Sequence, residues 1–384
     1  MRLGLLIAAG LALGMAVVNG LARFAYALIL PAMKADLAWS YTQAGSLNTI
    51  NAVGYLVGSY LAFRTVRIWG PKRPFIAGLW ITVAAVLATG VTRDFLALST
   101  LRFIAGVSGA YVFITGSVLA ASVFPHDARK AATAIAIYFG GGGAGLLLSG
   151  LTLPWLFVHD GDAAWPQAWL LLGAMSFVGS TLATLAAWPV TPPAARATPQ
   201  PWRKAPFMAM LLAYSCFALG YFAYMTFIVA WMREHGLGAY QVATVWSVLG
   251  LASIVAPRIW GRPIAHWSGG KSLAAILATI GTGAALPVLS SSLPAMLVSA
   301  ALFGMFFMTP ASITAFIKKA LNPAVWGEAV AAFTVLFSAL QCVGPVVTGA
   351  LADLTGSLAA GLGASAATLL LGAAIALLQR DHKA

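Results

Sequence analysis

Long runs of apolar residues, separated by short polar segments, occupy almost the whole chain. A helix that crosses the hydrocarbon core of a bilayer needs about 20 apolar residues, and twelve runs approach or exceed that length. Their expected bounds are 3–30, 44–63, 75–91, 95–123, 131–158, 168–187, 207–231, 240–257, 272–289, 295–317, 326–352 and 358–378. The pattern predicts an all-α integral membrane protein with twelve transmembrane helices. The first run is longer than the apolar core of a secretory signal peptide, so we interpret it as a helix.

Most lysine and arginine residues lie between the predicted helices, and they gather in every second loop. Cytoplasmic loops of membrane proteins carry an excess of these residues. If the N-terminus is cytoplasmic, seventeen of the 22 fall in inside segments and three, Lys34, Arg93 and Arg233, in outside loops. The remaining two, Arg23 and Arg102, lie within helices. We therefore expect both the N- and the C-terminus to be cytoplasmic.

A proline-rich, basic segment at 188–206 separates the first six predicted helices from the last six. Proline-rich segments act as extended, semi-rigid connectors. We expect an N-terminal six-helix bundle at 1–187, a cytoplasmic linker at 188–206 and a C-terminal six-helix bundle at 207–384. Two halves joined on the cytoplasmic side imply a parallel repeat about an axis along the membrane normal.

The composition agrees with a membrane protein, since 61% of the residues are apolar and only 8% are charged. A typical soluble domain carries about 25% charged residues. The net charge of +13 follows from the cytoplasmic loops, so we expect no nucleic-acid partner. Cys216 and Cys342 lie inside apolar runs and are interpreted as buried fillers. The five histidines form no ligand cluster and no hydrolase motif occurs, so we expect no metal, no cofactor and no enzymatic activity.

The loop between the second and third predicted helices resembles a signature of the major facilitator superfamily. Arg67-Ile68-Trp69-Gly70-Pro71-Lys72-Arg73 stands where that superfamily has Asp-Arg-x-Gly-Arg-Lys. The loop between helices 8 and 9 carries a second copy, His266-Trp267-Ser268-Gly269-Gly270-Lys271. Both copies lack the usual aspartate. The resemblance covers essentially the whole chain and implies two rocking bundles, with conformational roles for Arg67, Gly70, Lys72 and Arg73.

Three further segments extend this resemblance. Helix 4 carries Arg102 and Gly106 in the spacing of the superfamily's helix-4 arginine motif. Helices 5 and 11 carry glycine-rich stretches, which are expected to pack closely and flex; their marked positions are Gly141, Gly344 and Pro345. The opening segment from Gly20 to Met33 is similar to the YbfB/YjiJ-like branch of the superfamily.

Arg23 and Arg102 are the most informative residues for function. A charge at the centre of a membrane helix costs at least about 2.5–3.5 kcal/mol, so it normally faces a cavity or a partner. Each lies seven residues from the outer end of its predicted helix, which places both about 10 Å below the outer boundary. The resemblance implies that helices 1 and 4 line the central cavity. The polar neighbours expected beside these arginines are Asn19, Tyr26, Asn48 and Asn51.

None of the nine acidic residues lies deep in a predicted helix; Glu328 and Asp353 stand at the two ends of helix 11. Two buried arginines without a buried carboxylate leave positive charge that an anionic substrate could neutralise. The alternatives are that Arg23 reaches the interface, or that Arg102 bonds helix carbonyls as a structural brace.

The second half carries no charge inside a predicted helix. Tyr214, Tyr221 and Tyr224 lie on one face of helix 7, and Tyr224 is at the depth of Arg23. A tyrosine stripe of this kind is often packing alone. If Tyr221 and Tyr224 bind substrate, they hold an apolar or aromatic body while the first half holds a carboxylate.

These observations predict a secondary active transporter that works by alternating access. We expect a small organic anion as substrate, a monomer in the lipid bilayer, and a multi-pass location in a bacterial-type inner membrane. The alternatives are a proton-coupled drug or metabolite exporter, a lysolipid carrier or flippase, and a sensor that does not transport. The exporter is disfavoured because it usually needs a carboxylate buried within a helix.

Overall fold

The computed structural model describes residues 2–191, 204–322 and 325–381, which form helices and connecting turns without any strand. Nine of the helical units in this part are continuous. They are α3 (Tyr41–Trp69), α4 (Lys72–Thr89), α5 (Phe95–Ser122), α6 (Ala128–Asp160), α7 (Trp165–Ala187), α8 (Met208–Glu234), α9 (Ala239–His266), α10 (Lys271–Leu289) and α15 (Leu358–Leu377). They agree with the predicted runs to within a few residues, except that α3 and α9 continue further at their C-terminal ends.

Three further units are interrupted, which hydropathy alone did not predict. The first unit comprises α1 (Arg2–Met15), a π-helical stretch (Ala16–Phe24) and α2 (Tyr26–Asp36). The tenth comprises α11 (Leu293–Phe303), a 3₁₀ turn (Gly304–Phe307) and α12 (Met308–Ala320). The eleventh comprises α13 (Trp326–Leu340) and α14 (Val343–Thr355).

Eleven helices of the described chain are long and apolar enough to cross a membrane. The exception is α3, which is 29 residues long but carries a row of polar side chains. Among them, Asn48 and Asn51 form buried hydrogen bonds with neighbouring helices. The polar face that lowers the hydropathy of α3 is thus used inside the bundle. The twelve-helix membrane fold agrees with the prediction.

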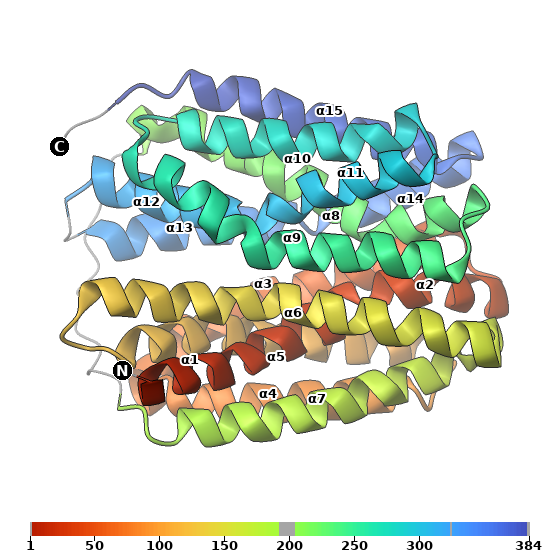
Figure 1. Cartoon of the computed structure of the whole chain (residues 1–384), viewed down its shortest axis with the longest axis horizontal. Helices are drawn as coiled ribbons and strands as arrows, with labels where there is room; N and C mark the ends of the chain where they lie inside the picture. Colours follow the sequence, from red (N-terminus) through yellow and green to blue (C-terminus); the bar gives the residue numbers. More distant parts are fainter. Residues whose placement is uncertain (1, 192–203, 323–324, 382–384) are drawn as a thin grey trace.

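The two halves of the chain form two groups of antiparallel helices (Figure 1). Helices α1–α7 lie together in the lower group and α8–α15 in the upper group, and both chain ends lie at the same end of the molecule. The lysine and arginine distribution marks this end as cytoplasmic. Most of the predicted linker lies outside the described residues, so the boundaries at 187 and 207 stay predictions.

Close approach between helices depends on glycine at the positions that the sequence marked. A methyl group on Gly106 of α5 would overlap the carbonyl oxygen of Asn51 on α3. A methyl group on Gly141 of α6 would overlap the Ala12 carbonyl of α1 in the same way. Gly344 of α14 lies against the backbone of α8. These glycines let helices pack at backbone distance, as expected for membrane helices.

The largest part of the apolar core is continuous between the two halves. The largest cluster joins residues such as Phe24 and Trp169 of the first half to Phe222 and Phe306 of the second. Towards the cytoplasmic end, the first half has a further cluster around Phe75, against which Phe307 of the second half also packs. The second half has a separate small cluster around Trp260 in the same region.

Candidate functional site

Arg102 is held by the backbone of the first helical unit. Its Nη1 donates to the carbonyl oxygen of Ala22 at 2.6 Å, and its Nη2 donates to Asn48 Oδ1 at 2.7 Å. The guanidinium group also lies over the Tyr26 ring, 4.9 Å from its centroid. Ala22 belongs to the π-helical stretch. Because Arg102 is 2% exposed and its partners are protein groups, its geometry is that of a brace between α5, α3 and the first helix.

Arg23 faces the other half of the molecule. Its Nη2 donates to Gln341 Oε1 at 2.7 Å, and Gln341 comes from the break between α13 and α14. The guanidinium carbon lies 4.6 Å from the centroid of the Phe222 ring and 5.0 Å from that of Tyr55. Tyr221 donates its hydroxyl to the same Gln341 oxygen, also at 2.7 Å. Arg23, Gln341 and Tyr221 thus form one polar cluster between the two halves, which we call the Arg23 cluster.

The Arg23 cluster has more buried donors than acceptors. Arg23 Nε and Gln341 Nε2 are both buried and have no hydrogen-bond partner. Gln341 Oε1, which can accept two hydrogen bonds, already receives both from Arg23 and Tyr221. Neither Arg23 nor Arg102 takes part in an ion pair within the described residues. An added group with several acceptor oxygens would satisfy the remaining donors.

The other predicted site residues lie near these arginines with separate partners. Asn48 donates across the halves to Thr226 Oγ1 at 2.9 Å. Asn51 donates to the Arg102 carbonyl, and Tyr26 donates its hydroxyl to the Ala44 carbonyl. Asn19 approaches the Met15 sulfur. A small cavity of about 10 Å³ touches Asn19, Arg23, Asn51 and Tyr55, enough for about one water molecule.

The two tyrosines named from the sequence have different environments. Tyr221 belongs to the Arg23 cluster and stacks on Phe217, Phe222 and Phe337. Tyr224 instead shares a hydrogen bond with Ser299 at 2.7 Å and stacks on Phe303 within the second half. Tyr224 therefore has the contacts of a packing residue.

Sequence reasoning missed Gln341, which supplies the polar group on the second side of the cluster. The signal was present, because Gln341 stands four residues before Pro345 in an otherwise apolar run. Proline removes the hydrogen bond to the carbonyl four residues earlier and its ring clashes with that carbonyl. The helix breaks at this point, and Thr49 of α3 donates to the carbonyl of Cys342 in the break at 2.8 Å.

The outer end is closed by polar contacts between the halves. Asp353 of α14 accepts from the backbone nitrogens of Tyr41 and Thr42 at 2.8 Å each, at the N-terminus of α3. Arg233 forms a bidentate ion pair with Asp162. Tyr41 also donates to Glu234. Together with the continuous apolar core, these contacts define a conformation closed on the outer side.

The superfamily-like loop residues lie at the cytoplasmic end of the first half. Lys72 donates to the Trp188 carbonyl at 2.6 Å, which joins the start of α4 to the end of α7. Gly70 ends α3 with φ +67°, a conformation that favours glycine. Arg73 is exposed and Arg67 lies in the last turn of α3; the side chain of Arg67 is outside the described part.

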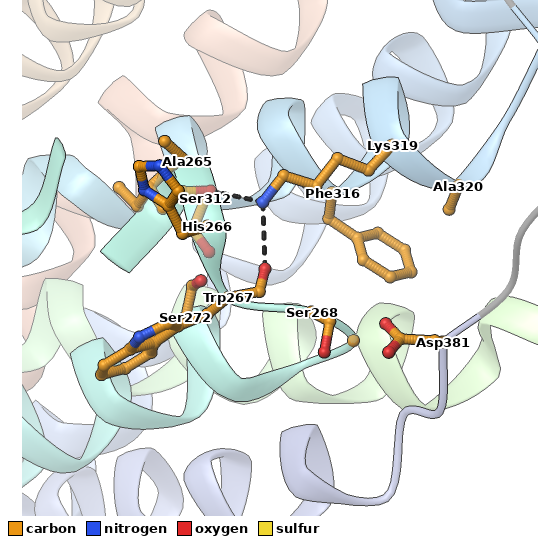
Figure 2. Close-up of a pocket in the computed structure, with 12 residues that line it drawn as sticks. Ala265, His266, Trp267, Ser268, Ser272, Ser312, Phe316, Lys319, Ala320 and Asp381 are labelled. Carbon is orange, nitrogen blue, oxygen red and sulfur yellow. Dashed lines mark hydrogen bonds between the residues drawn. The ribbon is translucent and has the colours of Figure 1, made fainter. Parts of the chain in front are cut away.

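The second half has a cavity of about 360 Å³ at its cytoplasmic end. Figure 2 shows Lys319 reaching to the end of α9, where it donates to the carbonyls of Ile264 at 2.6 Å and Trp267 at 3.0 Å. Asp381 lines the same cavity. Lys319 therefore stabilises the C-terminus of α9. No group of three or more potential metal ligands occurs among the described residues.

Comparison with solved structures places this architecture among transporters. The nucleoside transporter NupG matches with a TM-score of 0.71 at 13% identity, covering 98% of this chain and 97% of that one. A bacterial homologue of the human lysosomal transporter Spinster, in an inward-facing and unoccupied conformation, matches with a TM-score of 0.66 at 15% identity. That match covers 97% of this chain and 94% of the other. At such identities the likeness shows the fold alone.

Two sequence comparisons concern the family to which the chain belongs. A chloramphenicol resistance protein from Streptomyces lividans is 30% identical over 117 residues, which is 30% of this chain and 30% of the relative. The model of the family described as uncharacterised MFS-type transporter YbfB matches residues 13–377. The chain therefore belongs to the YbfB-type family of major facilitator superfamily transporters, as its opening segment and loop motifs indicated.

Proposed function

We propose that this protein is a secondary active transporter for a small organic anion, with Arg23 binding the anionic group. The observation that carries the proposal is the surplus of buried donors in the Arg23 cluster, at the boundary between the two halves. A carboxylate offers about four acceptor sites and accepts charge-assisted hydrogen bonds from a guanidinium fork. All nine acidic residues stand at or beyond helix ends, which leaves the positive charge at this depth without a carboxylate of the protein.

The rings around the cluster favour an anion with an apolar or aromatic body. Tyr221 stacks on Phe306 and Phe337 with interplanar angles of 20° and 23°, and Phe24 of the first half packs edge-on against Phe306. A planar substrate could extend from Arg23 along these faces. In this arrangement Arg102 positions the first helix and does not touch the substrate.

A carrier of this fold would expose the cluster to each side of the membrane in turn. The contacts of Asp353 and Arg233 support a state closed to the outside. Opening of the outer end and closure of the cytoplasmic end would complete the cycle by rocking of the two halves. We propose that the protein acts as a monomer in an inner membrane of bacterial type.

Export of a drug or metabolite is a second candidate, because the chloramphenicol resistance protein shares 30% identity over 117 residues. A neutral substrate could accept hydrogen bonds from Arg23 and Gln341 but would not neutralise the charge of Arg23, and a cationic substrate would be repelled by it. The anionic substrate is therefore preferred.

A thermal-shift experiment on the purified protein tests the proposal. The probes are benzoate, its neutral amide benzamide, the cation benzylamine and lysophosphatidylglycerol. A ligand present at 100 times its Kd adds about 2.7 kcal/mol to the stability of the folded state. We expect benzoate to raise the Tm while benzamide and benzylamine leave it unchanged.

Two variants locate the binding site. Arg23→Ala should abolish the benzoate shift, since breaking a buried charge pair costs about 2–5 kcal/mol of binding. Arg23→Lys should recover only part of it, because lysine lacks the planar fork. Arg64→Ala is the matched control, since Arg64 lies over the ring of Tyr60 at an exposed position. Stabilisation by benzylamine or benzamide alone would overturn the anionic substrate, and stabilisation by the lysolipid alone would point to a lipid carrier.

A further inference from the structure

We propose that the Gln341 side chain is an internal ligand that occupies the place of the substrate's anionic group on Arg23 when the carrier is unloaded. The consequence is that the unloaded carrier can close and reorient, so the protein performs net transport and is not restricted to exchange. This inference rests on the proposed function for the identity of the group that Gln341 replaces.

The geometry of the amide oxygen matches that of a carboxylate oxygen. Gln341 Oε1 receives Arg23 Nη2 from one half and the Tyr221 hydroxyl from the other, each at 2.7 Å. An amide oxygen has two lone pairs in the same planar arrangement as a carboxylate oxygen. Gln341 is 0% exposed, so these two bonds replace water that the donors would otherwise bind.

The position of Gln341 is fixed by its backbone. Pro345 breaks the helix after Leu340, and within the break the Cys342 carbonyl accepts a hydrogen bond from Thr49 of the first half. The side chain is therefore held at the boundary between the halves, where it can reach Arg23. Its own Nε2 group has no acceptor and is buried.

A glutamine side chain can change from hydrogen-bond acceptor to hydrogen-bond donor by rotation of its amide. When a carboxylate binds Arg23 and Tyr221, the Gln341 oxygen is released, and rotation of the amide lets Nε2 donate to the same carboxylate. The Gln341 amide, which bonds to Arg23 in the empty site, then becomes a further donor to the substrate in the loaded site. Leucine could do neither, and glutamate would place a permanent anion on Arg23 that excludes an anionic substrate.

The test measures how often the outer end is open, by the distance between two spin labels on the full chain in nanodiscs. Labels on Asp160→Cys and Leu354→Cys, which are exposed at the outer ends of α6 and α14, report opening. Cys216 and Cys342 are replaced by serine. We expect Gln341→Leu to increase the outer-open population by about 10- to 100-fold, the scale for losing a hydrogen bond to a buried charge.

Gln379→Leu is the matched control, because Gln379 is also buried in the second half but bonds to the Pro206 carbonyl, away from Arg23. It should leave the distance distribution unchanged. Gln341→Glu should keep the outer end closed and abolish the benzoate thermal shift. If Gln341→Leu does not fold, an unaltered benzoate affinity of Gln341→Glu would overturn the inference.

The outcomes separate this inference from the proposed function. Addition of benzoate should close the outer end of Gln341→Leu again. An outer-open Gln341→Leu that ignores benzoate would support the internal ligand and overturn the anionic substrate. An unchanged distance distribution in Gln341→Leu, together with loss of the benzoate shift in Arg23→Ala, would overturn the internal ligand and support the anion site.

Discussion

Replacement of Asp353 by asparagine should loosen the closed outer end. Asp353 places a carboxylate on the N-terminus of α3, where it accepts from two backbone N–H groups at 2.8 Å and from the Thr42 hydroxyl at 2.6 Å. The N-terminus of a helix carries a partial positive charge and unpaired N–H donors. Because α14 and α3 belong to different halves, these bonds exist only while the outer end is closed.

The size of the effect on opening follows from the interactions that asparagine retains and those that it loses. Its single oxygen can retain part of the hydrogen bonding, but the favourable interaction of a charge with the helix end is lost, which is worth about 0.3–1 kcal/mol at an exposed site. Weaker hydrogen bonds from the first N–H groups of α3 add about 0.5 kcal/mol or more, the scale of an N-cap substitution. A total near 1 kcal/mol corresponds to about a fivefold increase in the outer-open population.

Cys342 serves as a native reporter for this change. It is half-buried beneath the outer contacts, and its carbonyl is bonded to Thr49. In a Cys216→Ala background, the rate at which an impermeant thiol reagent labels Cys342 in intact cells should rise about fivefold in Asp353→Asn. The matched control is Asp160→Asn, an exposed carboxylate at the outer end of α6.

Two results would contradict this reasoning. An unchanged labelling rate in Asp353→Asn would mean that the apolar contacts alone keep the outer end closed. An equal rise in Asp160→Asn would mean that surface charge in general, and not the bonds of Asp353 to the N-terminus of α3, controls the opening.

Three further predictions concern topology, stability and coupling. In a background without native cysteines, Asp160→Cys should react with an impermeant reagent in intact cells and Arg129→Cys, at the other end of α6, should not; the reverse pattern would invert the topology. Arg102→Ala should lower the Tm more than Arg23→Ala does. The change leaves the Ala22 and Asn48 oxygens without donors, which costs about 1–3 kcal/mol for each oxygen. Equal Tm values would refute the role of Arg102 as a structural brace. Glu328→Gln should keep transport, measured in proteoliposomes, within a few-fold of the parent, since Glu328 lies in the first turn of α13; an inactive but folded variant would favour proton coupling through this carboxyl.

The sequence by itself determined the membrane class and its topology. Hydropathy and loop charge are local properties, and the bilayer requires each spanning helix to satisfy its own backbone hydrogen bonds. For this reason the helix bounds and the shared depth of Arg23 and Arg102 could be predicted without knowing any contact between helices. The glycines of helices 5 and 11 likewise predicted close packing, because glycine has no side chain.

Only the tertiary structure decided how the two arginines differ. Their sequence contexts are alike, but Arg102 meets the carbonyl of Ala22 in a π-helical stretch, and Arg23 meets Gln341, which is 318 residues away. The same holds for Asp353, whose partners Tyr41 and Thr42 lie more than 300 residues earlier. Contacts of this kind depend on how whole helices lie side by side, which local hydropathy does not encode, because a buried polar group can find its partner on any neighbouring helix.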